Sequence, residues 1–240
     1  MAYPAPSIRW TMDNTGVNAA NPGTYDLTLS GGSDISYATD RIVGSRSLFM
    51  DPTDDTTGDY AATVTSPWTA KAATMTVAFW AKPTGYGWAG CGVSFGGNAT
   101  NKQAIKFGSD NYGNLSAICN GYSWMKLSGL TLIGFAWNFY CLVYHGAWDV
   151  EHPENCLHGF RNRTKSTTFS EASGATDPFP LNNSIAIGRT YLDWASPYWY
   201  YNGSGYMDNV MVWAGTQLTD VQVMSVYDAT APKYGLQPYA

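Results

Sequence analysis

The sequence predicts an all-β protein, a two-sheet antiparallel jelly-roll sandwich that ends in one short helix. Short apolar or alternating runs, separated by Gly, Asn, Asp and Pro, recur along the whole chain. Hydrophobic residues make up 45% of the chain and aromatic residues 15%, enough for a two-layer core. Sandwiches of 240 residues commonly form one domain. We therefore expect a single domain over residues 1–240, with a core at about 8–228 and an extended tail at 229–240.

The clearest strand in the first half of the chain is Thr74 to Ala81. Its apolar residues alternate, so Met75, Val77, Phe79 and Ala81 share one face and Trp80 lies on the other. Pro83 should end this strand, because proline cannot donate to a sheet ladder.

Further strands follow at short intervals. Residues 104–107 and 115–119 are separated by GSDNYGN, which is typical of a hairpin loop. Residues 137–146, WNFYCLVYHG, are apolar on both faces and predict a central strand, and CLHGFRNRTKSTTF predicts its partner. Residues 184–188 and 206–213 supply late strands. This number of strands suits a two-sheet jelly roll.

The four cysteines lack the CxxC or Cys/His spacing of a zinc site. Free buried thiols are the expected state. If a disulfide forms, Cys141 and Cys156 are the best candidates, because they flank the predicted turn near Asp149.

A helix is expected to begin at Asp220. Thr219 and Gln222 form a capping box, and Leu218 with Val223 forms a hydrophobic staple. Two turns of helix would not persist alone. We expect it to pack Val223, Val226 and Tyr227 onto the edge of the sandwich.

Charge and hydropathy exclude several classes of function. Charged residues are only 13% of the chain and the net charge is -5, so nothing suggests a nucleic-acid partner. No apolar run reaches the ~18 residues of a membrane span, so no membrane insertion is expected. The start, MAYPAPSIRW, does not resemble a signal peptide.

The order of several short blocks resembles the laminin-G-like (LamG-like) jelly-roll domains of the concanavalin A-like lectin/glucanase superfamily. In the closing block, Gly205, Met207-Asp208 and the strand to Trp213 are followed by Leu218-Thr219 and Val226-Tyr227. Earlier blocks are Gly44 with Ser47-Leu48-Phe49, residues 74–82, residues 137–146 and residues 185–189. One departure is His158-Gly159, where these domains often have Asn-Gly in a hairpin turn.

The resemblance implies a concanavalin A-like fold and a structural calcium ion held by Asp208 and by acids near the first strand, here Asp13. The segment DPTDDTTGD, Asp51 to Asp59, also carries four carboxylates in nine residues, but aspartate is common in solvated turns. Calcium is the only cofactor that the sequence suggests.

Paired catalytic carboxylates are not apparent. Glu151, Glu154 and Glu171 fall in predicted loops or strand ends, and no strand carries two acids at alternate positions. His145, His152 and His158, with Tyr144, could act as the base and acid of a lyase. Three histidines in one hairpin also arise by chance, so we expect no enzymatic activity.

Aromatic loops are the strongest binding signal. The segment YLDWASPYWYYNG carries Tyr191, Asp193, Trp194, Tyr198, Trp199, Tyr201 and Asn202, and two other loops add Trp88 and Trp124. Sugar rings stack on aromatic side chains while carboxylate and amide groups bind their hydroxyls. Aromatic side chains also make subunit contacts or fill cores, so these three roles stay open.

These observations favour a non-enzymatic surface module at a virion surface or outside the cell. The first hypothesis is a phage or virus virion component, such as a capsid decoration or fibre protein, that binds glycans. Its partners would be glycans or neighbouring structural-protein subunits, including a homo-oligomer of this chain. A secreted carbohydrate-binding lectin module and a polysaccharide hydrolase or lyase are the alternatives.

Overall fold

A computed structural model describes residues 2–30, 35–42, 44–50, 60–63, 74–84, 92–96, 104–109, 114–119, 123–131, 134–146, 149–173, 185–187, 190–191, 199–200 and 205–231. The strands are β1 (Ile8–Trp10), β2 (Leu27–Ser30), β3 (Ile35–Ala38), β4 (Ser47–Met50), β5 (Tyr60–Thr63), β6 (Met75–Pro83), β7 (Gly92–Gly96), β8 (Ala104–Ser109), β9 (Asn114–Cys119), β10 (Ser123–Thr131), β11 (Asn138–Tyr144), β12 (Leu157–Arg161), β13 (Thr164–Ser166), β14 (Phe169–Ser173), β15 (Ile185–Ile187), β16 (Thr190–Tyr191), β17 (Trp199–Tyr200) and β18 (Gly205–Ala214). The helices are the 3₁₀ turn η2 (Pro153–Asn155) and α1 (Asp220–Thr230).

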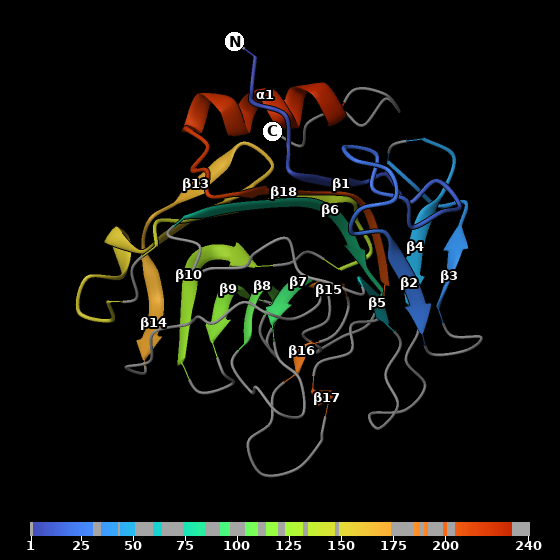
Figure 1. Ribbon diagram of the computed structural model, residues 1–240. Helices are drawn as coiled ribbons and strands as arrows, with labels where there is room; N and C mark the ends of the chain where they lie inside the picture. The colour runs from blue at the N-terminus through green and yellow to red at the C-terminus, as the bar shows by residue number, and fades with distance from the viewer. Residues whose placement is uncertain are drawn as a thin grey trace.

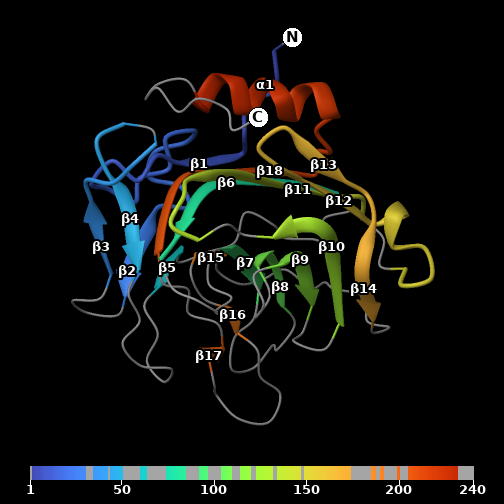
Figure 2. The same cartoon turned by 180° about the vertical axis from the view of Figure 1, so that it is seen from behind.

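Two antiparallel sheets form the sandwich, as the sequence predicts (Figure 1). Sheet A has the order β13-β12-β11-β6-β18-β4-β3, and β1 also pairs with β18. Sheet B has the order β14-β10-β9-β8-β7-β15-β5-β2. A separate ribbon, β16 with β17, lies on the side of sheet B away from sheet A (Figure 2). Some neighbours, such as β7 to β10 in sheet B, follow one another in the chain, whereas β18 pairs with β6 and β4, which lie far away in the sequence. These long-range pairs join the two halves of the chain in sheet A.

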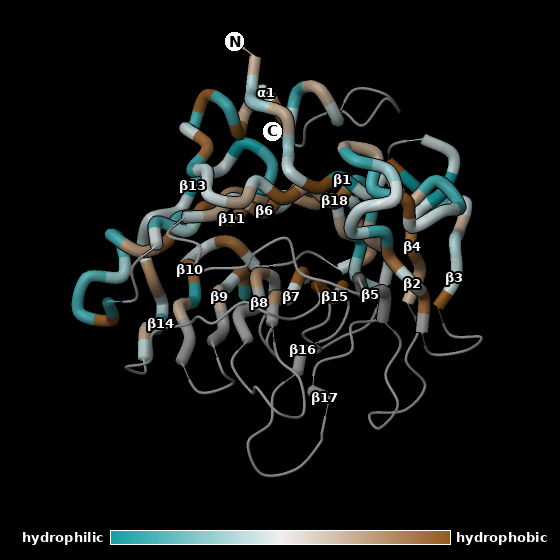
Figure 3. Tube along the Cα trace, viewed as in Figure 1, coloured by the Kyte–Doolittle hydropathy of each residue, from teal (hydrophilic) through white to brown (hydrophobic). Residues whose placement is uncertain are grey.

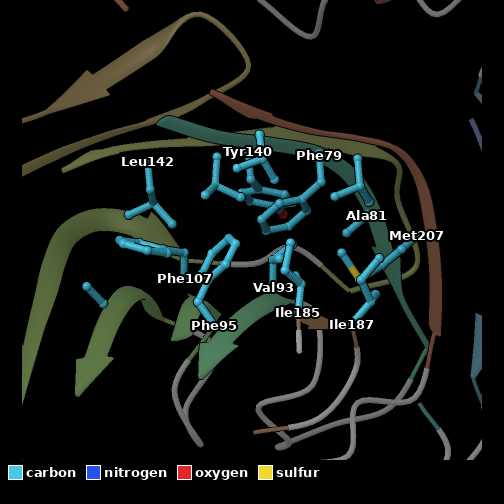
Figure 4. Close-up of a cluster of buried hydrophobic side chains, with 14 of the residues drawn as sticks. Phe79, Ala81, Val93, Phe95, Phe107, Tyr140, Leu142, Ile185, Ile187 and Met207 are labelled. Atoms are coloured by element: carbon cyan, nitrogen blue, oxygen red, sulfur yellow. The ribbon is translucent and has the colours of Figure 1, made fainter. Parts of the chain in front are cut away.

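The main core lies between the two sheets, and the alternation of β6 predicts it correctly. Met75, Val77, Phe79 and Ala81 all face this core. Figure 4 shows Phe79 from sheet A above Phe95 and Phe107 from sheet B. These side chains are completely buried, and Figure 3 shows that the hydrophobic residues concentrate along the strands of both sheets.

A second core lies on the outer face of sheet A, beneath α1. Trp80 stacks on Tyr227 with ring centroids 5.8 Å apart, and its indole N–H donates to Thr230 Oγ1 at 3.0 Å. The capping box at Thr219 and Gln222 is confirmed. Two details of the prediction are wrong: α1 has 11 residues, and it covers the face of sheet A instead of an edge. The face is available because β6 and β11 carry apolar residues on both sides.

The proposed disulfide does not form. Cys141 and Cys156 are both buried free thiols. Cys141 belongs to the cluster beneath α1, whereas Cys156 belongs to the core between the sheets. The two thiols therefore face opposite sides of sheet A.

Two other local expectations change. His158 and Gly159 lie inside β12, and the hairpin turn falls at Asn162, whose φ of 52° is the left-handed conformation that such a turn requires. Glu171 lies within β14 and pairs with Lys126 at 2.8 Å. No helix in the described residues is long and apolar enough to cross a membrane.

Candidate functional site

The aromatic loop predicted from the sequence is only partly described. Tyr191 lies in β16, Trp199 in β17 and Trp124 in β10, and only their backbone is described. The β16 strand lies against β7 and β8 on the outer side of sheet B. The remaining predicted ligand-binding residues lie outside the described residues: Trp88, Asp193, Trp194, Tyr198, Tyr201 and Asn202.

A different group of aromatic and charged residues lines up across the outer face of sheet A. Tyr206 of β18 pairs in register with Lys82 of β6 on one side and Phe49 of β4 on the other. Asn138 pairs with Ala81, so the preceding Trp137 comes alongside Lys82. We call Trp137, Lys82, Tyr206 and Phe49 the outer stripe.

The outer stripe points away from the main core. Ala81, Met207 and Leu48, which neighbour its members in sequence, all face the core between the sheets. Side chains alternate along a strand, so Lys82, Tyr206 and Phe49 face outward. All four members are half-buried, in contrast to the adjacent Trp80, which α1 covers. The stripe is therefore accessible where the cluster beneath α1 ends.

Direct contacts hold the outer stripe together. The Tyr206 ring centroid lies 4.7 Å from that of Phe49 and 6.1 Å from that of Trp137. The Lys82 ammonium lies 5.6 Å from the Tyr206 centroid, within range of a cation–π interaction.

Asp40 connects two members of the stripe. Its Oδ1 accepts a 2.7 Å hydrogen bond from the Trp137 indole N–H, and its Oδ2 pairs with the Lys82 ammonium. The side chains of Lys82 and Asp40 are 24% and 37% exposed. A carboxylate has about four acceptor positions and an ammonium has three donors. Both groups thus have hydrogen-bonding capacity beyond their mutual contact.

This arrangement matches the chemistry of sugar binding. Aromatic rings provide apolar surface for the C–H faces of a sugar, and the Asp40–Lys82 pair offers an acceptor and donors to hydroxyl groups. The pair is fixed by Trp137 before any ligand binds, which lowers the entropy cost of binding.

An exposed aromatic residue, Phe135, lies near the same end of sheet A. Its backbone N–H donates to the Pro83 carbonyl at 2.6 Å, and Pro83 directly follows Lys82 and pairs with Gly205. Phe135 is 58% exposed and has a φ of 63°, an unfavourable conformation for a bulky residue. Strained residues of this kind cluster at ligand sites.

The ends of β4 and β6 and the beginning of β18 meet here, and each adjoins, along the chain, a segment that the sequence analysis singled out. Met50 pairs with Gly205, which also pairs with Pro83. The acidic segment 51–59 follows Met50 in the chain, the segment with Trp88 follows β6, and the segment with Tyr201 and Asn202 precedes Gly205. These segments lie outside the described residues.

The two acids predicted to hold calcium both accept hydrogen bonds from one chain segment. Asp13 Oδ1 accepts the backbone N–H groups of Ser45 and Arg46, and Asp208 Oδ2 accepts that of Ile42 at 2.8 Å. Backbone N–H groups suit a carboxylate but repel a cation. Within the described ranges, no three His, Cys, Asp or Glu residues gather as metal ligands. Each of these contacts uses one oxygen of its carboxylate, and calcium binding stays a prediction.

Two of the three histidines, His145 and His158, form a pair at the end of β11 that lies opposite the outer stripe. His145 Nε2 and His158 Nδ1 lie 2.7 Å apart, and His158 Nε2 lies 3.6 Å from Asp220 Oδ1. Burial lowers the pKa of His158 to about 4, with further lowering by Lys165 and His145, against a raising effect of Asp220. Burial, with Lys165, also lowers the pKa of His145. The pair is therefore neutral at pH 7, and its facing nitrogens are occupied by each other.

Sequence reasoning missed Asp40, Lys82, Trp137 and Tyr206 as a site. Lys82 and Tyr206 stand on the outward face at strand ends, a signal visible in the alternation of each strand. Their neighbourhood depends on β11, β6, β18 and β4 being adjacent, which no single segment reveals.

No protein-family model matches the chain, and no curated protein matches its sequence. Solved structures do share its fold. Domain 4 of AbnA, a GH43 extracellular arabinanase from Geobacillus stearothermophilus solved with arabinotriose, has a TM-score of 0.63 at 15% identity, covering 94% of this chain and 99% of that domain.

Two further structures are similar. The botulinum neurotoxin serotype D binding domain has a TM-score of 0.56 at 12% identity, and the match covers 94% of this chain but only 52% of the toxin domain. The cellulose-induced protein Cip1 has a TM-score of 0.51 at 12% identity, covering 80% of this chain and 92% of Cip1. At these identities the similarity establishes a shared β-sandwich fold.

Proposed function

We propose that this protein is a carbohydrate-binding module without catalytic activity, and that the outer stripe with Asp40 forms part of its binding site. The observation that carries the proposal is the alignment of Lys82, Tyr206 and Phe49 across three strands with Trp137, which directly precedes β11, and with Asp40 fixed beside them.

The structural neighbours support the same class of function. One was solved with arabinotriose, and a further neighbour at a TM-score of 0.55 and 8% identity is botulinum neurotoxin type C, whose cell entry depends on two ganglioside molecules. These two neighbours support glycan binding as the proposed function, and the match to the toxin covers 51% of that chain. The finer assignment to the LamG-like domains of the concanavalin A-like superfamily rests on the order of the sequence blocks.

Several contacts favour binding over catalysis. Glu171 is engaged by Lys126, and His145 and His158 are engaged with each other. A retaining glycosidase needs two carboxyl groups about 5 Å apart, and the described contacts of Asp40 are with Lys82 and Trp137, not with a second acid.

The experiment is a glycan-array screen of the wild-type chain beside Tyr206→Leu and Lys82→Met, each measured in calcium and in chelator. Tyr206→Leu removes the ring but keeps apolar bulk, and Lys82→Met keeps the stem but removes the charge. Val221→Ala is the matched surface control, because Val221 is 53% exposed on α1, away from the stripe. We expect at least a tenfold loss of affinity in both stripe variants and none in the control.

A second pair of variants tests the aromatic loop. If Trp194→Ala/Trp199→Ala abolishes binding while both stripe variants retain it, the glycan site lies in the loop and the stripe assignment is wrong. No binding by the wild-type chain, or release of sugar products from a polysaccharide panel, would contradict the proposed function itself.

We propose the virion role as a second, finer assignment. It rests on the low charge and the aromatic-rich loops, because aromatic residues also make subunit contacts. Light scattering of the purified chain tests it: a stable homo-oligomer supports a coat or fibre component, and a monomer at high concentration favours a secreted lectin module.

A further inference from the structure

The connection between β3 and β4, described at residues 39–42 and 44–46, carries Asp40, and two distant acids bind its backbone. Asp208 in β18 accepts the Ile42 N–H, and Asp13 after β1 accepts the N–H groups of Ser45 and Arg46. Hydrogen bonds to a charged acceptor are about twice as strong as neutral ones. The two carboxylates thus fix the connection at its middle and at its end.

Gly44 leaves room for the Asp13 carboxylate against the backbone of this connection. Gly44 has a φ of 70°, and a Cβ atom built there would lie 2.0 Å from both carboxylate oxygens of Asp13. Only glycine avoids this overlap and adopts this conformation without strain. The Arg41 guanidinium closes the same turn by donating to the carbonyls of Gly44 and Thr39.

Asp208 faces outward from β18, immediately before an irregularity in this strand. The pairing of β18 with β6 shifts register between Asp208 and Met211. Asn209 within this bulge has a φ of 45°, and its Oδ1 accepts a 2.8 Å hydrogen bond from Arg9 Nε. Bulges redirect side chains and are frequent next to functional sites. Asp208 is completely buried, so its carboxylate contacts other parts of the protein and not solvent.

Asp40 stands at the start of the same connection. Its carbonyl accepts the Ser47 hydroxyl, and its carboxylate reaches Trp137 and Lys82 on the outer stripe. Ile42, two residues later, is 1% exposed and packs into the cluster beneath α1. The position of Asp40 therefore depends on the anchoring of residues 42–46.

We propose that Asp13 and Asp208 are positioning residues of the binding site. They hold the connection between β3 and β4 so that the Asp40 carboxylate stays in contact with Trp137 and Lys82. Their described contacts are acceptor contacts with backbone N–H groups, a role different from the calcium ligation that the sequence resemblance implies. The relevance to ligand binding rests on the proposed function, whereas the anchoring of Asp40 does not.

The test observes the Trp137 indole N–H directly in a ¹H–¹⁵N NMR spectrum, with its signal identified by its loss in Trp137→Phe. We expect Asp13→Ala and Asp208→Ala to shift this signal in the direction seen for Asp40→Ala. Asp13→Asn and Asp208→Asn should leave it near its wild-type position, because an amide oxygen still accepts an N–H. The indole signals of Trp80 and Trp213 are internal controls, since they donate to Thr230 and Pro4.

The outcomes separate the two proposals. A Trp137 signal that stays in place in Asp13→Ala, the half-buried and more tolerant position, overturns the positioning role even if Asp208→Ala fails to fold. A signal that moves when calcium is chelated from the wild-type protein, with no rescue by the Asn variants, also overturns it in favour of metal ligation. A signal that moves as expected in a chain that binds no glycan upholds the positioning role and rejects only the proposed function. Where glycan binds, the Ala variants should lose about tenfold in affinity.

Discussion

Acid is expected to destabilise this protein through His158. The residue is 8% exposed, and its pKa is lowered to about 4 in the folded chain, first by desolvation and then by Lys165 and His145. An unfolded chain returns it to about 6.5. Between these values the unfolded state binds more protons, so stability is complete above about pH 6.5 and falls as the pH approaches 4.

The magnitude follows from the two pKa values. The loss attributable to His158 is about 1.4 kcal/mol at pH 5.5 and about 2.5 kcal/mol at pH 4.5, relative to pH 7.5. Carboxylates also titrate in this range, so the wild-type chain alone does not isolate the effect. His158→Asn provides the comparison, because its side-chain amide has both an acceptor and a donor for His145 Nε2 but does not titrate.

The assay is urea unfolding followed by tryptophan fluorescence at pH 7.5, 5.5 and 4.5 for both chains. We expect the wild-type free energy of unfolding to fall more steeply than that of His158→Asn, by about 2.5 kcal/mol over the full range. The same pH dependence in both chains would refute the reasoning, because it would mean that His158 is as easily protonated in the folded state as in the unfolded one.

Three further predictions concern stability and the state of the cysteines. Gly44→Ala should lower the free energy of unfolding by about 1–3 kcal/mol, because the φ of 70° and the Asp13 carboxylate leave no room for a Cβ atom. Chemical denaturation measures this loss, and an unchanged midpoint would contradict the geometry. Thr219→Ala should cost about 1 kcal/mol by removing the α1 cap, whereas Thr219→Ser should cost much less, and equal losses would argue against the cap. Because Cys141 and Cys156 are free thiols, peptide mapping of the protein digested without reduction should find these two residues unlinked, and a Cys141–Cys156 linked peptide would contradict the structure.

Features with a local cause were predictable from the sequence. The capping box places the start of α1 correctly because Thr219 and Gln222 interact across one turn of the same segment. The two-sided burial of β11 follows from its continuous apolar run. The sequence left the position of this hairpin turn open at His158-Gly159, and the structure places the turn at Asn162, which adopts the left-handed conformation.

The candidate site was not predictable in the same way. The sequence drew attention to the aromatic-rich segment at Tyr191 because its residues are contiguous, and its side chains lie outside the described residues. Trp137, Lys82, Tyr206 and Phe49 are spread over four segments that are far apart in the chain. They become neighbours only through the pairing of β11, β6, β18 and β4.

The sequence by itself determined the class of fold, the faces of the principal strands and the beginning of the final helix, because each depends on side-chain periodicity or contacts within a few residues. The tertiary structure decided the order of strands, the covering of sheet A by α1 and the partners of Asp13, Asp40 and Asp208. These depend on contacts between distant segments, such as the contact between Ile42 and Asp208, which are 166 residues apart. Such contacts are selected by the packing of the whole sandwich, because no local pattern specifies which strand lies beside which.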